Sequence, residues 1–188
     1  MTEAPEKTPL YAWYALALLM VVYILNFLDR TIIYILFPLI KKELAFSDTQ
    51  LALLGTTSFV IFYTLLGIPF GRLADRSSRA KIIAIGVAVW SLFSGLTAFA
   101  NDFWTLFFCR VMVGVGEATL GPAAISLLSD YFPPLKRATV TSVYSMGIAI
   151  GAGFAALLGG SLSQYGWRTA FMIVGFPGMV LGGLVFFF

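Results

Sequence analysis

Six apolar segments constrain the fold of this chain more than any other feature of its sequence. Most hold roughly 20 to 25 residues, about the length that an α-helix needs to cross a bilayer. The mean hydropathy of +0.92 and the charged fraction of 11% also indicate a chain that folds in lipid. We therefore predict an all-α membrane protein of six transmembrane helices, with spans at 11–40, 49–73, 80–100, 103–129, 138–162 and 169–188.

The expected layout is a short N-terminal tail at 1–10 and one bundle over 11–188. Lys and Arg gather on the side of the N-terminus, and cytoplasmic loops carry an excess of these residues. We therefore expect that side, and both ends of this chain, to face the cytoplasm. The chain stops inside the sixth apolar segment, so we interpret it as the first half of a longer protein.

A weak internal repeat relates the two halves of the bundle. The strings GRLADRSSR, from Gly71, and GSLSQYGWR, from Gly160, share Gly, Leu and Arg at an offset of 89 positions. One string follows the second span and the other follows the fifth, on opposite sides of the membrane. The same offset brings Asp29 within one residue of Glu117. This pattern predicts two inverted three-helix repeats.

Four ionisable residues lie inside the apolar spans: Asp29, Arg30, Arg110 and Glu117. Each costs about 3 kcal/mol at mid-membrane depth, so such residues mark a solute or proton pathway by default. The chain contains no histidine, which leaves Asp29 and Glu117 as the candidate proton carriers. Helical rise places Asp29 about 22 Å from one face and Arg110 about 10 Å from the other. We therefore predict one layer of Asp29, Arg30 and Arg110, with Asp29 paired to Arg110 and Glu117 two turns below.

Protonation of Asp29 or Glu117 would then release an arginine, Arg30 or Arg110, to bind an anionic head group through two hydrogen bonds. An alternative is that Arg110 and Glu117, which share one helix face, form a purely structural salt bridge between helices. The cavity wall is expected to be mostly apolar or aromatic, and its candidate residues are Asn26, Tyr34, Phe59, Tyr63 and Gly114.

The loop after the second span carries the most specific string, Gly71 to Arg79. Gly71 is expected to permit close helix approach. Asp75 is expected just before the third helix, where a carboxylate meets exposed amide dipoles. Arg76 and Arg79 could pair with Asp75 or with lipid headgroups.

This loop resembles the signature of the major facilitator superfamily, although Ser78 and Ala80 depart from the usual glycine and basic residue. Together with NFLDR in span one and R-x-x-x-G-x-G-E in span four, it resembles the spinster branch most. The resemblance implies a proton-coupled secondary transporter with alternating access, moving an amphipathic anion such as a lysolipid or a sphingosine-phosphate-like lipid. It also implies a bacterial inner membrane and a second six-helix half, against which Asp75 would latch.

Other functions stay open at this point. An organic-anion or sugar-acid proton symporter would share the same fold, and a non-transporting membrane sensor or scaffold belongs to a different class. An enzyme is disfavoured, because the sequence contains no histidine and no metal-ligand cluster. ATP-driven transport is also disfavoured, because the sequence contains no nucleotide-binding loop. We expect no cofactor, no metal and no nucleic-acid partner.

Overall fold

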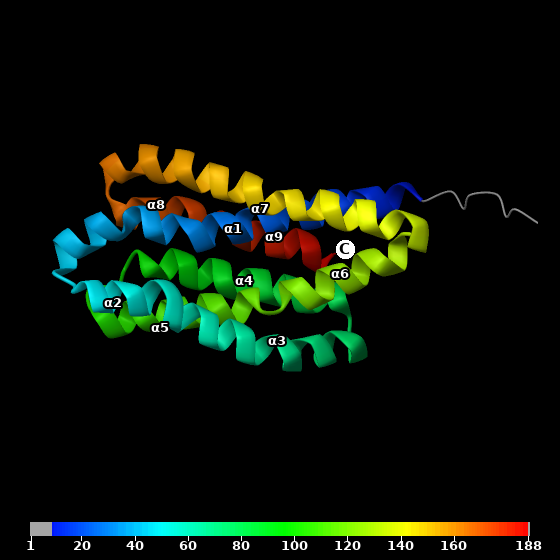
Figure 1. Ribbon diagram of the computed structural model, residues 1–188, viewed down its shortest axis with the longest axis horizontal. Coiled ribbons are helices and arrows are strands. Elements are labelled where there is room, and N and C mark those ends of the chain that lie inside the picture. Colours follow the sequence, from blue (N-terminus) through cyan, green and yellow to red (C-terminus); the bar gives the residue numbers. More distant parts are fainter. Residues whose placement is uncertain (1–8, 188) are drawn as a thin grey trace, which may run out of the picture.

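The computed structural model describes residues 9–187, so the first eight residues of the expected tail at 1–10 lie outside the described part. Within it, six helical spans are long and apolar enough to cross a membrane (Figure 1), which confirms the predicted fold class. The spans are Leu10–Leu44, Asp48–Arg76, Arg79–Thr97, Phe103–Tyr131, Pro134–Tyr165 and Trp167–Phe186.

Several spans consist of more than one helical element. Spans one and three are the single helices α1 (Leu10–Leu44) and α4 (Arg79–Thr97). Span two joins α2 (Asp48–Ala52), the π-helix η1 (Leu53–Thr57) and α3 (Ser58–Arg76). Spans four to six comprise α5 (Phe103–Glu117) with α6 (Leu120–Tyr131), α7 (Pro134–Leu162) with the 3-10 helix η2 (Ser163–Tyr165), and α8 (Trp167–Gly175) with α9 (Pro177–Phe186).

Two helices begin at well-formed caps. Ser47 and Gln50 form a capping box at the start of α2, in which the backbone N–H of Gln50 donates to Ser47 Oγ at 3.2 Å. Asp102 caps α5, where it accepts the Thr105 hydroxyl at 2.6 Å and the Thr105 amide at 3.0 Å. These hydrogen bonds, the hydroxyl first, lower the pKa of the Asp102 carboxyl.

Span four is interrupted where the sequence predicted one continuous helix. The α-helical pattern ends at Glu117 and resumes at Leu120. Pro122 has no amide hydrogen, so it cannot donate to the carbonyl of Ala118. The interruption places Glu117 at the end of a half-helix inside the span.

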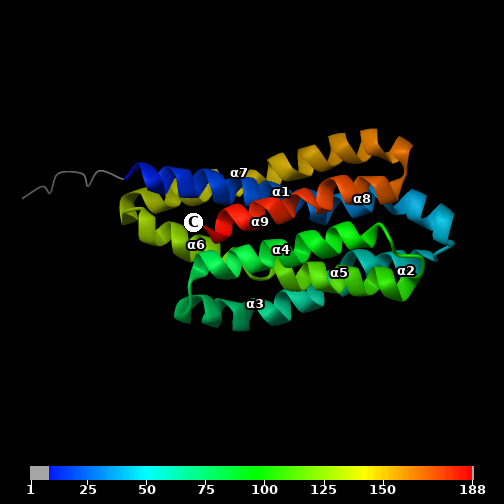
Figure 2. The ribbon, with the colours of Figure 1, turned by 180° about the vertical axis from the view of Figure 1, so that it is seen from behind.

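Helix α4 lies in the middle of the bundle and packs against α5, α6, α8 and α9, while α1 packs along α7 (Figures 1 and 2). Glycine permits the closest of these approaches. A Cβ at Gly116 would lie 2.7 Å from the Trp90 amide nitrogen and 2.8 Å from the Gly86 carbonyl oxygen. The backbones of α4 and α5 therefore touch directly beside Glu117.

Two ion pairs connect the repeats, one at each end of the bundle. Arg79, at the start of α4, pairs with Asp130 in α6. Arg168, at the start of α8, pairs with Glu43 in α1 at 3.0 Å. The two arginines end the repeated strings, and each reaches an acid near the end of the first span of the other repeat. The pairing follows the inverted-repeat symmetry predicted from the sequence.

Candidate functional site

The four charged residues of the apolar spans lie together inside the bundle. Asp29 is 2% exposed, and Arg110 and Glu117 are each 1% exposed. The side chain of Arg30 is 25% exposed, so one side of the charged centre opens outward. Asp29, Arg110 and Glu117 are buried, as the sequence predicted, whereas Arg30 is partly exposed.

Arg30 and Glu117 form the ion pair of this centre. Arg30 Nη2 donates to Glu117 Oε2 at 2.7 Å and Nε donates to the same oxygen at 3.1 Å. Side chains lean toward the N-terminus of their own helix. The helices α1 and α5 cross the bundle in opposite directions (Figure 2). The side chains of Arg30 and Glu117 therefore lean toward each other and close the gap between their levels.

Asp29 faces a different helix. Consecutive residues of an α-helix point about 100° apart, and Asp29 accepts the Ser94 hydroxyl of α4 at 2.5 Å. No ion pair forms at Asp29 within residues 9–187. Asp29 and Arg30 are therefore adjacent in the sequence but contact different helices, α4 and α5.

The predicted pair between Asp29 and Arg110 is wrong. None of the three guanidinium nitrogens of Arg110 has a hydrogen-bond partner in the described part of the chain. Its guanidinium lies 5.7 Å from the ring centroid of Phe59. The prediction failed because it compared the depths of α-carbons, whereas the lean of the side chains decides which charges meet.

Three aromatic rings surround the Arg30 guanidinium. Its central carbon lies 4.5 Å from the ring centroid of Phe59, 4.8 Å from that of Tyr63 and 4.9 Å from that of Phe27. Phe59 and Tyr63 were expected in the cavity wall, and both contact the charged centre. A cation over an aromatic face is stabilised by about 0.5–2 kcal/mol, with the larger values where water is excluded.

The remaining predicted wall residues divide between two places. Gly114 lies against the same wall, because a Cβ there would be 2.9 Å from the Phe59 carbonyl oxygen. Asn26 is 2% exposed and its amide nitrogen has no partner in the described residues. Tyr34 instead donates its hydroxyl to the Gly55 carbonyl of η1 at 2.6 Å, and it lines a separate cavity of about 460 Å³.

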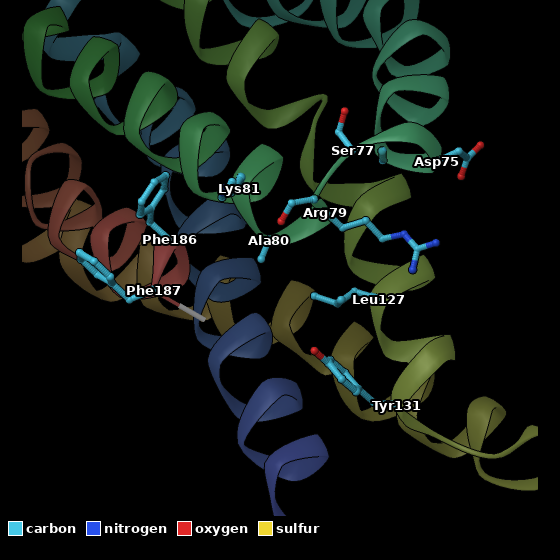
Figure 3. A pocket seen from close by; sticks show the side chains of 11 residues that line it. Asp75, Ser77, Arg79, Ala80, Lys81, Leu127, Tyr131, Phe186 and Phe187 are labelled. Atoms are coloured by element: carbon cyan, nitrogen blue, oxygen red, sulfur yellow. The ribbon is translucent and has the colours of Figure 1, made fainter.

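The signature loop lies at the end of the bundle where α1 begins, beside a cavity of about 530 Å³ (Figure 3). Asp75 is in the last turn of α3 rather than in front of α4, whose N-cap is Ser78. Its carboxylate points away from the cavity and has no hydrogen-bond partner among residues 9–187. The expected contact between Asp75 and the amides of α4 is therefore wrong.

The other loop residues also differ from expectation. Arg79 pairs with Asp130 and not with Asp75. Arg76 is the last residue of α3. A Cβ at Gly71 would lie 3.7 Å from Pro122, which is an ordinary contact. Gly71 thus permits no unusually close helix approach in this state.

Three residues of these sites were missed by the sequence reasoning: Ser94, Phe27 and Asp130. Ser94 belongs to a polar series in an otherwise apolar span, with Ser91 and Thr97 at three-residue spacing. That spacing, which repeats on one helix face, could have identified it. Phe27 and Asp130 carry no comparable local signal, because their importance comes from partners in other spans.

No group of three metal-ligating side chains lies together in the described residues. The charges of the centre are instead two carboxylates and two guanidiniums, which sum to zero. Such an arrangement can hold an anion on a guanidinium, exchange ion-pair partners, or carry a proton on a carboxylate.

Fold and centre together define a class: a multi-pass membrane bundle of inverted repeats around buried charges, as in secondary transporters. The sequence matches the Major Facilitator Superfamily over residues 19–188, and the chain belongs to that family.

Two relatives and one solved structure illustrate the similarity. An MFS-type efflux pump of Mycolicibacterium smegmatis is 35% identical over 97% of this chain and 43% of its own length. A hexuronate transporter of Bacillus subtilis is 31% identical over 88% of this chain and 39% of its own length. A bacterial homolog of the human lysosomal transporter Spinster, inward-facing and occupied, is 35% identical with a TM-score of 0.90, over 96% of this chain and 45% of that structure. The fold is thus spinster-like, and the chain spans less than half the length of these proteins.

Proposed function

We propose that this chain forms the N-terminal half of a proton-coupled secondary active transporter. The transported solute would be an amphipathic anion, such as a lysolipid or a sphingosine-phosphate-like lipid. A second six-helix half would complete the path and permit alternating access. Family membership and the buried charges support this proposal.

The observation that carries the proposal is the state of Arg110. A guanidinium that is 1% exposed and has no hydrogen-bond partner in the described residues is costly to keep charged. A phosphate or carboxylate group would supply two parallel hydrogen bonds of the kind that guanidinium groups favour. The neighbouring ring of Phe59 would contact the apolar part of such a ligand.

The ion pair between Arg30 and Glu117 provides the proposed coupling. When Glu117 takes up a proton, its attraction for Arg30 falls and the guanidinium is free to join Arg110 on the anion. Asp29 is the second candidate proton carrier, because it accepts a hydrogen bond from the neutral Ser94 hydroxyl and forms no ion pair within residues 9–187. Proton uptake and solute binding would therefore depend on each other.

The proposal also places the chain in the membrane. We propose a bacterial inner membrane with the N-terminus in the cytoplasm, because basic residues gather at the end where α1 begins. Among the described residues these are Arg72, Arg76, Arg79, Lys81, Lys136 and Arg137, against Lys41, Lys42 and Arg168 at the other end. Asp75, exposed at the cytoplasmic end, would be available to latch onto the second half.

The test is uptake by the full-length protein in liposomes with and without a proton gradient. Glu117→Gln should make uptake insensitive to the gradient if Glu117 carries the proton, and Asp29→Asn should do so if Asp29 carries it. Asp102→Asn, at the exposed cap of α5, should leave the gradient dependence unchanged. Full gradient-driven uptake by Asp29→Asn would overturn the role of Asp29. Loss of gradient dependence in Glu117→Gln alone would assign the proton to Glu117.

The hexuronate transporter among the relatives favours a second candidate, a sugar-acid proton symporter. The same liposomes would therefore receive a hexuronate in one arm and a lysophospholipid in the other. Gradient-dependent uptake of only the hexuronate would replace the lipid proposal with this one. Absence of uptake for both, in a correctly folded protein, would favour a non-transporting sensor or scaffold.

A further inference from the structure

Three aromatic rings surround the Arg30 guanidinium, although its ion pair with Glu117 does not require them. A carboxylate alone neutralises Arg30, yet the guanidinium also lies within 5 Å of three ring centroids, from Phe27 in α1 and from Phe59 and Tyr63 in α3. Proteins recognise ammonium groups in ligands by placing several aromatic faces around the cation. The Arg30 guanidinium lies in such an arrangement, with a carboxylate beside the rings.

We propose that Phe27, Phe59, Tyr63 and Glu117 form a binding subsite for an organic cation, which the guanidinium of Arg30 occupies in this state. The ligand group would be a protonated amine or a quaternary ammonium on an amphipathic molecule. It would replace Arg30 against the rings and the carboxylate. The inference rests on the proposed function in one respect, which is that Arg30 is the group that moves.

The exposure of the residues shows how such an exchange can occur. The Glu117 side chain is fully buried, whereas that of Arg30 is 25% exposed. The guanidinium can therefore leave through the open side while the carboxylate and the rings stay in place. Phe59 itself is 4% exposed, and the backbone of α5 at Gly114 supports it from behind.

The neighbouring arginine extends the inference to the whole ligand. Phe59 lies between the two guanidiniums, 4.5 Å from that of Arg30 and 5.7 Å from that of Arg110. The Arg110 guanidinium has no hydrogen-bond partner in the described residues, so its N–H groups are available to donate to an anionic group. A ligand with both an anionic and a cationic group would satisfy Arg110 and the aromatic subsite together. The subsite therefore selects zwitterionic over purely anionic amphiphiles.

The test measures binding of two probes to the full-length protein by calorimetry: hexyltrimethylammonium and hexyl phosphate. The Arg30 side chain competes with a free cation for the subsite. A cation can bind only while Arg30 is out of the subsite, so the apparent affinity is the intrinsic affinity multiplied by the fraction of time that the subsite is empty. Arg30→Gln should therefore tighten hexyltrimethylammonium binding by about tenfold or more. In that background, Phe59→Leu should weaken the same binding by about tenfold, as expected for loss of a desolvated cation–π contact. Phe93→Leu, which removes a ring that contacts Phe108 instead, should leave it unchanged.

The double variant Arg30→Gln/Glu117→Gln guards against misfolding, because it leaves neither charge of the pair alone. It should still bind hexyltrimethylammonium more tightly than the unaltered protein, since the ring faces are free. Unchanged or weaker ammonium binding in both Arg30 variants would overturn the subsite, and so would equal effects of Phe59→Leu and Phe93→Leu.

The second probe separates this inference from the proposed function. If Arg30→Gln weakens hexyl phosphate binding and leaves ammonium binding unchanged, the anion site stands and the cation subsite is wrong. If ammonium binding tightens while uptake by the unaltered protein ignores the proton gradient, the subsite stands and the proposed coupling is wrong.

Discussion

Asp29 and Glu117 lie within one residue of corresponding positions in the two repeats, yet they have different partners. Asp29 accepts a hydroxyl from Ser94, whereas Glu117 accepts two hydrogen bonds from Arg30. The residue after Asp29 is Arg30 and the residue after Glu117 is Ala118, so only the first repeat supplies this arginine. Protonation therefore has different consequences at the two acids: Asp29 has no paired cation to release, whereas protonation of Glu117 unpairs Arg30.

The largest expected loss of stability comes from a substitution at the residue that precedes one of the two acids. Gly116 precedes Glu117, whereas Leu28 precedes Asp29. Gly116→Ala should lower the free energy of unfolding by about 3 kcal/mol, because the new methyl group would meet the backbone of α4 at a point that cannot move aside. Thermal unfolding of the full-length protein in detergent measures this.

Gly121→Ala is the matched control in the same span. Its Cβ would lie 3.8 Å from the Tyr63 hydroxyl, an ordinary contact, so its effect should stay below about 1 kcal/mol. Equal destabilisation by both variants would show that the close approach of α5 to α4 at Gly116 does not account for the loss of stability.

The next largest loss of stability is expected when the acids themselves are replaced. Glu117→Gln should destabilise the protein by about 2 kcal/mol, less than the ~3–5 kcal/mol of a fully buried broken pair because Arg30 is partly exposed. Asp29→Asn should cost less than about 1 kcal/mol, since an amide oxygen still accepts the Ser94 hydroxyl. Unfolding midpoints of the two variants at neutral pH decide the order. A larger loss in Asp29→Asn would contradict the partner assignment.

A smaller effect isolates the hydroxyl that Asp29 accepts. Ser94→Ala should cost about 1–2 kcal/mol, the value of a hydrogen bond to a buried carboxyl group. Ser91→Ala, one turn earlier on α4, removes a buried hydroxyl that has no partner in the described residues and should cost almost nothing. The same unfolding assay applies, and equal losses would mean that the Ser94 contact contributes no stability.

The smallest effect belongs to an exposed carboxylate, which serves as a reference for the two buried ones. The hydrogen bonds from Thr105 lower the pKa of Asp102 in the folded protein. Its contribution to stability is therefore present above the unfolded pKa of about 4 and is lost as the pH falls through the lower folded value. Asp102→Ala should remove this contribution at pH 7, and the difference from the unaltered protein should shrink toward pH 3.

The control for that experiment is Asp102→Asn, which retains an N-cap side chain without a titrating group. Its unfolding midpoint should show less acid dependence than that of the unaltered protein. An acid dependence equal to that of the unaltered protein would assign the titration to other carboxylates.

Sequence reasoning recovered the features that depend on local pattern. Span number follows from the length of apolar runs, and the burial of Glu117 follows from the apolar residues around it. It failed for pairing, because the partner of Arg30 depends on how two antiparallel helices direct their side chains. The interruption of span four had a local signal, Pro122 after Gly121, that the hydropathy pattern concealed.

The ion pair at Arg168 has a consequence for how the bundle assembles during synthesis. Arg168 also donates to the carbonyls of Ala98 and Ala100, at 2.7 Å each, which follow α4. Those carbonyls are made about 70 residues before their partner, and Glu43 is made 125 residues before it. When the first and third spans are made, the arginine that joins their ends has not yet been made. The sixth span, which is made after both of them, joins their ends through Arg168.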